Sequence, residues 1–220
     1  MIGSRFSLGE IKKIVFSDFY LFREYRDGHF NTIIDIGANI GVFSVFARMR
    51  HPGAKIIAVE PNPEALKFFY DNTNGLNITL VNKAIGNGAK FYFHSRGDTI
   101  RDMYLEEEST GNSIESVTIL DIKNSYGIEE PYAIKCDCEG AEKHFIGNSD
   151  SERILLGADF IALEIHFKSQ KNNVGGWIEW EDYRNWINSV FVDTHSILYY
   201  KSSRRRGFGH YVLKRNITNQ

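Results

Sequence analysis

The chain has 220 residues, a length that favours a single domain with at most a small insertion. Apolar residues make up 42% of the chain, charged residues 25%, and only four positions are proline. This composition excludes the disordered, low-complexity and collagen-like classes. The 26 Lys and Arg residues nearly balance the 28 Asp and Glu residues, so we expect no general attraction to nucleic acid or to anionic membranes.

The sequence predicts a cytoplasmic protein without membrane association. Its longest uncharged stretch, Ile36–Ala47, is shorter than the roughly 20 apolar residues of a membrane-spanning helix. Charged residues interrupt the first 16 positions before the apolar core of a secretory signal can form. Cys136 and Cys138 are two apart in a predicted strand, which is poor geometry for a mutual disulfide. We therefore expect free thiols in a reducing compartment.

The first third of the chain alternates between predicted strands and helices. An N-terminal extension over residues 1–30 contains apolar residues at helical spacing, which predicts an amphipathic helix from Ser7 to Tyr25. Strand–helix alternation after it indicates parallel β-α-β units with right-handed crossovers. The predicted strands are Thr32–Gly37, Lys55–Glu60 and Ile78–Val81, and the predicted helices are Ile40–Arg50 and Pro63–Asp71.

The segment 86–125 interrupts this alternation and is predicted to be a small β insertion that serves as a lid. It contains a polar, acidic stretch from Asp98 to Asn112 between two predicted strands, Lys90–His94 and Ser116–Leu120. We interpret the acidic stretch as a loop that closes over one end of the sheet.

Strand–helix alternation then resumes and ends in an antiparallel hairpin. The remaining predicted strands are Tyr132–Cys138, Phe160–His166, Asp193–Tyr200 and Phe208–Lys214, and helices are predicted from Ala141 and over Trp180–Val190. The expected fold is one α/β domain over 1–220, with a mostly parallel seven-stranded sheet, a C-terminal antiparallel hairpin and helices on both faces. This arrangement matches the Rossmann-like sheet of class I S-adenosylmethionine-dependent methyltransferases.

The strongest motif is Asp35-Ile-Gly37-Ala-Asn39-Ile-Gly41 at a strand-to-helix turn. Gly37 allows a sharp turn and close approach of a ligand to the backbone. The motif is not the dinucleotide pattern G-x-G-x-x-G, because position 39 is Asn. We expect a nucleoside without a diphosphate, which disfavours a nicotinamide-dependent oxidoreductase.

Acidic residues stand at the carboxyl ends of three further predicted strands. Glu60 precedes Pro61-Asn62-Pro63, and an acid at this edge can accept both hydroxyls of a ribose. Lys135, Asp137 and Glu139 alternate along another strand, and Glu164 and His166 along the next. Charges at the end of an apolar strand are costly unless they have a function.

Together these residues resemble the FkbM family of methyltransferases over roughly residues 32–166. The aliphatic residues usual in the family are replaced by Cys136 and Cys138. The motifs that carry the resemblance are DIGANIG at Asp35–Gly41, AVEPNP at Ala58–Pro63, VNKAIGN at Val81–Asn87, TILDI at Thr118–Ile122, IKCDCEGAE at Ile134–Glu142 and ALEIH at Ala162–His166.

The resemblance implies a binding site for S-adenosylmethionine. Glu60 would hold the ribose, and Asp137 would lie nearest the sulfonium. Around the methionine end, with Asp35 acting on its ammonium directly or through water, would lie Asp35, Gly37, Ala38 and Asn39. Around the adenine would lie Pro61, Asn62, Lys83 and Ala84.

The resemblance also implies methyl transfer to a hydroxyl of a small molecule, such as a sugar or glycan precursor. His166 is the first candidate for the general base because the ordinary pKa of histidine is about 6.5; Asp137 is the second. Glu139 and Glu164 complete the expected catalytic group. Asp137, Glu139, Glu164 and His166 could also bind a divalent cation, but no spacing fixes a coordination geometry, so no metal is predicted.

Two other functions share this fold. An RNA methyltransferase would require a basic face and an Asn/Asp-Pro-Pro-aromatic signature for a flipped base, and the chain has neither. A catalytically inactive binding module would bind the cofactor without methyl transfer.

Overall fold

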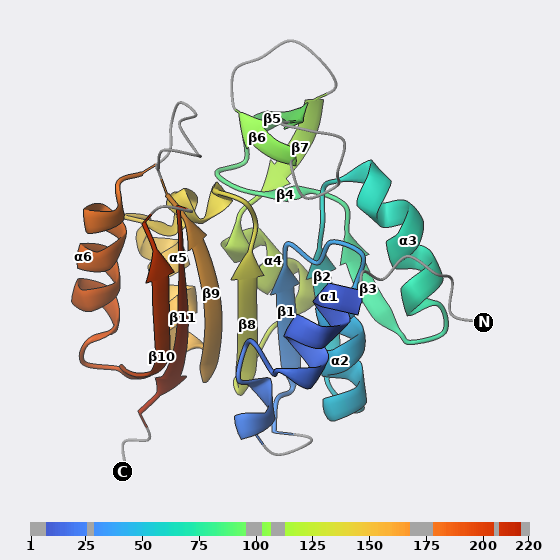
Figure 1. Ribbon diagram of the computed structural model, residues 1–220, viewed down its shortest axis with the longest axis horizontal. Helices are drawn as coiled ribbons and strands as arrows, with labels where there is room; N and C mark the ends of the chain where they lie inside the picture. Colours follow the sequence, from blue (N-terminus) through green and yellow to red (C-terminus); the bar gives the residue numbers. More distant parts are fainter. Residues whose placement is uncertain are drawn as a thin grey trace.

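The computed structural model describes residues 8–25, 29–95, 103–106, 113–167, 178–204 and 207–216. Its centre is a seven-stranded sheet in the order β10-β11-β9-β8-β1-β2-β3 (Figure 1). The five strands from β9 to β3 are parallel to one another, whereas β11 pairs antiparallel with both β9 and β10. The predicted mostly parallel sheet with a C-terminal hairpin is therefore confirmed. These strands are β1 (Thr32–Ile36), β2 (Lys55–Val59), β3 (Ile78–Val81), β8 (Tyr132–Asp137), β9 (Phe160–His166), β10 (His195–Ser203) and β11 (Phe208–Arg215).

Helices cover both faces of this sheet because successive side chains of its central strands point to opposite sides. Ile33 of β1 packs with the N-terminal segment and α2 (Val42–Arg50). Ile34, its neighbour, packs in the larger core with residues of α4 (Ile119–Tyr126), α5 (Ser149–Gly157) and α6 (Trp180–Phe191). α3 (Pro63–Thr73) packs against the β2 residue Ala58. All of β1 and β9 is buried, as expected for strands covered on both faces.

The N-terminal helix is shorter than predicted. α1 (Leu8–Ile11) continues as a π-helix over Lys12–Phe16, and a separate short 3₁₀ helix follows at Phe22–Glu24. Between them, Asp18 and Leu21 adopt positive φ values of 46° and 51°. The Asp18 carboxylate accepts hydrogen bonds from the backbone nitrogens of Phe22 and Arg23, so this side chain stabilises a turn in place of a continuous helix. The turn inserts Tyr20 and Phe22 into the core.

A second, four-stranded sheet lies above the carboxyl ends of the parallel strands (Figure 1). It has the order β4-β7-β5-β6, formed by β4 (Ala84–Ile85), β5 (Lys90–Ser95), β6 (Met103–Glu106) and β7 (Ser113–Val117). Most of the acidic stretch predicted as a loop over 98–112 lies outside the described residues, and its part Met103–Glu106 is a strand.

The strand predicted at Ser116–Leu120 is wrong in its second half. The β7 strand ends at Val117, and α4 begins at Ile119 after a capping box. In this capping box the Thr118 hydroxyl accepts a hydrogen bond from the backbone nitrogen of Asp121, and the Asp121 carboxylate accepts one from the backbone nitrogen of Thr118. Ile119 and Ile122 are buried in the larger core of the main sheet. The last residues of the segment predicted as an insertion therefore form a helix that covers the main sheet.

Within the described part of the chain, no helix has the length and apolar character needed to cross a membrane. Cys136 and Cys138 are both free thiols, as predicted.

Candidate functional site

The loop after β1 turns sharply at the carboxyl edge of the sheet. Gly37 has a φ of 73°, and a Cβ atom at this position would lie 1.8 Å from the backbone oxygen of Asp137. Asn39 also has a positive φ, 50°. The backbone nitrogens of Gly37 and Ala38 both donate to the oxygen of Val59, the last residue of β2. Glycine is thus required at position 37 by contact with β8 as well as by the turn itself.

Asp35 and Lys135 form a buried ion pair beneath this loop. Lys135 Nζ lies 3.1 Å from Asp35 Oδ1, and the two side chains are 4% and 0% exposed. The Ser44 hydroxyl donates to Asp35 Oδ2 at 2.6 Å. Lys135 also donates to the backbone oxygens of Ile36 and Gly37, and the neighbouring charge of Asp35 overcomes burial and raises the pKa of Lys135.

The Asp35 carboxylate is fully buried, and its predicted action on the methionine ammonium, directly or through water, stays a prediction. In this structure its charge holds Lys135, whose ammonium binds two carbonyl oxygens at the start of the loop. The ion pair therefore fixes the start of the loop through these two carbonyl oxygens.

Glu60 lies directly after β2 and binds both neighbouring loops. Its Oε2 accepts a hydrogen bond from the backbone nitrogen of Asn39 at 2.7 Å, and its Oε1 accepts one from that of Asn62 at 2.8 Å. The residue is only 7% exposed. Burial raises the pKa of Glu60 to about 7, although the two backbone hydrogen bonds oppose this shift. Each carboxylate oxygen can accept more than one hydrogen bond, so capacity remains for a pair of hydroxyl donors.

The residues predicted around an adenine lie at the ends of β2 and β3. Asn62 caps α3, with its side chain accepting from the nitrogen of Glu64, and Pro63 occupies the first turn. Ala84 is fully buried in β4. Lys83 forms an ion pair with Glu115 of the small sheet, with 2.8 Å between Nζ and Oε2 and 43% of its side chain exposed. No contact of the Lys83 side chain with Glu60 or the β1 loop is seen among the described residues.

The ends of β8 and β9 carry the second half of the site. Asp137 and Glu164 are directly opposite each other in the register of these parallel strands. The N-terminal segment reaches both residues: Tyr20 Oη donates to Asp137 Oδ2 at 3.0 Å, and Lys13 Nζ lies 3.2 Å from Glu164 Oε2. Burial would raise the pKa of Asp137, but the charges of Lys135, His166 and Lys13 outweigh it and lower the pKa.

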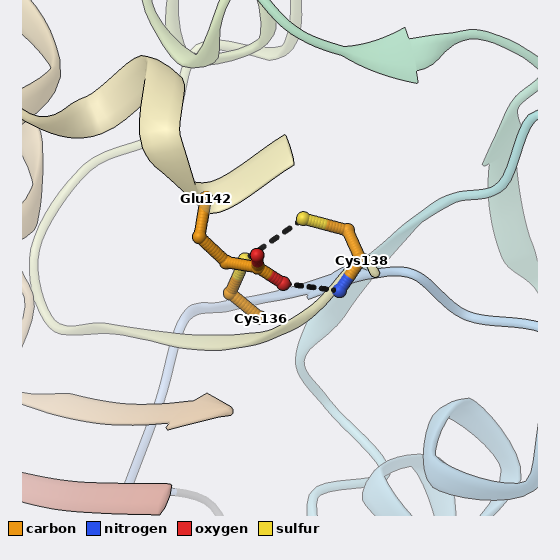
Figure 2. A group of neighbouring side chains, drawn as sticks. All are labelled: Cys136, Cys138 and Glu142. Carbon is orange, nitrogen blue, oxygen red and sulfur yellow. Dashed lines mark hydrogen bonds between the residues drawn. The ribbon is translucent and has the colours of Figure 1, made fainter. Parts of the chain in front are cut away.

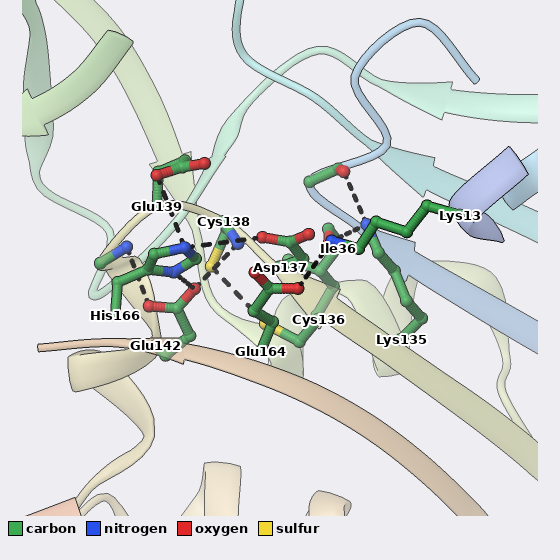
Figure 3. Close-up of polar contacts among 12 residues, drawn as sticks. Lys13, Ile36, Lys135, Cys136, Asp137, Cys138, Glu139, Glu142, Glu164 and His166 are labelled. Carbon is green, nitrogen blue, oxygen red and sulfur yellow. Dashed lines mark hydrogen bonds and ion pairs between the residues drawn. The ribbon is translucent and has the colours of Figure 1, made fainter. Parts of the chain in front are cut away.

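His166 is surrounded by three carboxylates (Figure 3). Its Nδ1 lies 3.2 Å from Glu142 Oε1, whereas its Nε2 lies 3.6 Å from Glu139 Oε2 and 3.9 Å from Asp137 Oδ1. Glu142 is fully buried, and its carboxylate also accepts from the backbone nitrogens of Cys138 and Gly140. The structure thus brings together the predicted residues Asp137, Glu139 and His166, and Glu164, on the same strand as His166, lies opposite Asp137.

These carboxylates change the expected role of His166. Burial alone would lower the pKa of His166, but the charges of Glu139, Glu142 and Asp137 outweigh it and raise the pKa well above its ordinary value. The prediction of a general base rested on the ordinary pKa of histidine. This raised pKa favours the protonated imidazole, which cannot take a proton from a substrate, so of the two predicted bases we favour Asp137.

A second group of potential ligands lies on the other side of Glu142. The thiols of Cys136 and Cys138 are 3.5 Å apart, and Glu142 lies beside Cys138 (Figure 2). Burial raises the pKa of both thiols. The carboxylate of Glu142 is already held by two backbone nitrogens and His166, so we interpret these thiols as part of the packing behind the site.

Three residues of the site were not predicted from sequence. Lys13 and Tyr20 come from the N-terminal segment, where the sequence contains no motif, so only the tertiary structure places them at the site. Glu142 lies in the motif around Asp137, and its position after Gly140 was the available signal. Gly140, with a φ of 102°, turns the chain so that Glu142 points back toward Cys138.

Comparison with known proteins identifies the family to which this geometry belongs. Residues 35–208 match the model of the methyltransferase FkbM domain. A 40-residue stretch is 48% identical to the 31-O-demethyl-FK506 methyltransferase FkbM of Streptomyces tacrolimicus. This stretch covers 18% of the chain and 15% of that protein, so the similarity spans only a small part of the curated relative.

Two solved structures share the fold. A methyltransferase FkbM from Methylobacillus flagellatus KT aligns with a TM-score of 0.51 and 17% identity, over 88% of this chain and 46% of that chain. A putative rRNA-methylase from Clostridium thermocellum aligns with a TM-score of 0.53 and 10% identity, over 91% of this chain and 94% of that chain. At these identities the two alignments establish the fold alone.

Proposed function

Because the chain belongs to the FkbM family of S-adenosylmethionine-dependent methyltransferases, we propose that it methylates a hydroxyl group of a small molecule, such as a sugar or glycan precursor. The observation that carries this proposal is the pairing of two sites at one sheet edge. Glu60 offers a carboxylate suited to a ribose after β2, and Asp137, Glu139, Glu164 and His166 cluster at the carboxyl ends of β8 and β9.

The cofactor fits the first of these sites on chemical grounds. The Glu60 carboxylate is anchored by the nitrogens of Asn39 and Asn62 and retains acceptor capacity for two ribose hydroxyls. Pro61 and Asn62 would flank the adenine, and Gly37, Ala38 and Asn39 would line the methionine end. Bound S-adenosylmethionine supplies a methyl group activated by the positive sulfonium.

The chain's own residues would position the acceptor and remove its proton. Holding the acceptor oxygen in line with the methyl group contributes about 7–11 kcal/mol to lowering a barrier of this type. Asp137 is held by Tyr20 at Oδ2, with a lowered pKa, so it is ionised and able to accept the hydroxyl proton. General-base catalysis of this kind contributes roughly 10²–10⁴-fold.

The chemistry of the second site supports a hydroxylated acceptor. Ionised carboxylates only accept hydrogen bonds, so Asp137, Glu139 and Glu164 suit neighbouring hydroxyl donors of a polyol. The same negative charges would repel the phosphates of a nucleic acid. The name of the curated relative, a 31-O-demethyl-FK506 methyltransferase, also denotes transfer to an oxygen atom.

The test is a transfer assay with methyl-tritiated S-adenosylmethionine, a pool of free sugars, nucleotide sugars and hydroxylated small molecules, and total RNA in a separate reaction. We expect label in the small-molecule pool, with mass spectrometry identifying a methyl ether. Label in RNA, or on nitrogen, would contradict the proposal. Cofactor binding without transfer to any acceptor would favour the inactive-module alternative.

A further inference from the structure

We infer that Asp137, Glu139 and His166 form a binding site for one hard divalent cation, such as Mn²⁺ or Mg²⁺, which binds the acceptor hydroxyl. This inference rests on the proposed function and deepens it. Among the described residues, Asp137, Glu139 and His166 each offer one ligand atom, and the three atoms lie within 4.8 Å of one another. The two carboxylate oxygens suit such a cation, and the imidazole would bind it through Nε2 after losing the proton that its carboxylate neighbours favour.

The separations are close to those of a coordinated triangle. His166 Nε2 lies 3.6 Å from Glu139 Oε2 and 3.9 Å from Asp137 Oδ1. Adjacent ligands of an octahedral cation bound at 2.1–2.4 Å are about 3.0–3.4 Å apart. These two separations would need to contract by less than about 1 Å, and the Asp137–Glu139 separation, which is below 4.8 Å, by less than about 2 Å. The half-exposed Glu139 has the freedom to supply most of this movement.

The side chains that hold His166 and Asp137 in place also support a cation site. Imidazole ligands of metals usually donate their second nitrogen to a carboxylate, which fixes the ring and the tautomer. Glu142 stands in this position, 3.2 Å from His166 Nδ1. Its carboxylate is itself held by the nitrogens of Cys138 and Gly140, so Nε2 is directed toward Asp137 and Glu139 (Figure 3). Tyr20 likewise holds Asp137 Oδ2 and leaves Oδ1 on the side of His166.

Three protein ligands leave coordination positions for the acceptor and water. A cation here would bind the acceptor hydroxyl and make it more acidic. The hydroxyl proton would pass to Glu164, opposite Asp137 in the sheet register, and from there to solvent. The oxygen–methyl bond forms while the methyl–sulfur bond breaks, and its electron pair stays on sulfur. In this arrangement Asp137 is a ligand and Glu164 takes over as proton acceptor.

Mn²⁺ binding to the metal-free protein tests this site without any measurement of activity. Loss of the free Mn²⁺ signal in electron paramagnetic resonance should reveal one saturable site in the wild-type chain. We expect Glu139→Gln to weaken binding at least tenfold, because it removes one of two charged ligands at a half-exposed position where folding is preserved. Glu181→Gln, at an exposed acid of α6, should bind Mn²⁺ like the wild type.

The absence of saturable binding up to millimolar Mn²⁺, or equal binding by the wild type and Glu139→Gln, would overturn the cation site. S-adenosylhomocysteine binding measured on the same samples separates this result from the proposed function. Cofactor binding without Mn²⁺ binding would disprove the cation site only. Site-specific Mn²⁺ binding without cofactor binding would support the cation site and contradict the proposed function.

Discussion

Glu60 Oε2 accepts a hydrogen bond from the backbone nitrogen of Asn39 at 2.7 Å. This contact joins the acid after β2 to the glycine-rich loop after β1, although the residues are 21 positions apart. The same carboxylate holds Asn62 at the start of α3. One side chain therefore sets the relative position of the two loops between which we place the cofactor.

The first prediction concerns the pH dependence of cofactor binding. Burial raises the pKa of Glu60 to about 7, and ribose hydroxyls donate to the ionised carboxylate. If the cofactor binds only the ionised form, affinity for S-adenosylhomocysteine should fall about tenfold between pH 8 and pH 6, following the ionised fraction. Titration calorimetry at both values measures the change, and Glu60→Gln should remove most of it.

Without cofactor, the stability of the protein should change with pH in the opposite direction. The pKa of Glu60 in the folded protein exceeds its unfolded value, so its contribution is fully present below about pH 4.5 and is lost as the pH rises through about 7. Thermal unfolding of Glu60→Gln should therefore depend less on pH in this window than unfolding of the wild type. If the melting temperatures of the two proteins changed with pH in the same way, the pKa of the Glu60 carboxyl would not be raised by folding.

A second prediction tests the turn after β1. In Gly37→Ala the new Cβ would overlap the backbone oxygen of Asp137 at 1.8 Å, and the positive φ alone costs about 1–2 kcal/mol. A loss of at least about 2 kcal/mol corresponds to a melting temperature lower by roughly 4–8 °C for a chain of this size. Gly53→Ala is the matched control, since nothing lies within 4 Å of a Cβ there. Equal melting temperatures for the two variants would contradict the described packing.

A third prediction concerns the buried pair of Asp35 and Lys135. In Lys135→Met the Asp35 carboxylate keeps its burial but loses its counter-charge, which should destabilise the protein by about 3–5 kcal/mol. The control is Lys67→Met, which breaks the exposed pair with Glu64 and should cost about 0–1 kcal/mol. Chemical denaturation measures both. The double variant Asp35→Asn/Lys135→Met should recover part of the lost stability. Similar losses of stability for Lys135→Met and Lys67→Met would argue against the buried pair.

A fourth prediction concerns catalysis. Asp137→Asn preserves the shape of the side chain but removes its charge, so kcat should fall about 10²–10⁴-fold while affinity for S-adenosylhomocysteine changes much less. Asp150→Asn, at an exposed residue of α5 paired with Arg153, provides the control. If Asp137→Asn retains kcat within a few-fold of the wild type, Asp137 is neither a base nor a ligand for the reaction.

The parallel sheet could be predicted from sequence because its strands are short apolar runs separated by turn residues and helices. The strands Ile78–Val81 and Phe160–His166 have the predicted boundaries. The N-terminal helix was predicted too long, since apolar spacing does not reveal that Asp18 accepts backbone hydrogen bonds and starts a turn. The helix at Ile119 was missed because the prediction extended the preceding strand through its capping residue, Thr118.

The site was predictable only where its residues follow strands directly. Asp137, Glu139, Glu164 and His166 lie at the carboxyl ends of two neighbouring parallel strands, so strand order alone brings them together. The raised pKa of His166 was not predictable, because it depends on the distances to three carboxylates. The contacts of Lys13 with Glu164 and of Tyr20 with Asp137 could not be predicted either, because these residues are 151 and 117 positions apart in the sequence.

Calorimetry of S-adenosylhomocysteine binding to Glu60→Ala tests the placement of the cofactor most directly. Loss of hydrogen bonds to a charged group, at about 1.5–3 kcal/mol each, should raise the Kd at least about tenfold in a variant that melts as a folded protein. Glu64→Ala, four positions along the chain at an exposed residue of α3, should bind like the wild type. A folded Glu60→Ala protein with wild-type affinity would contradict the account.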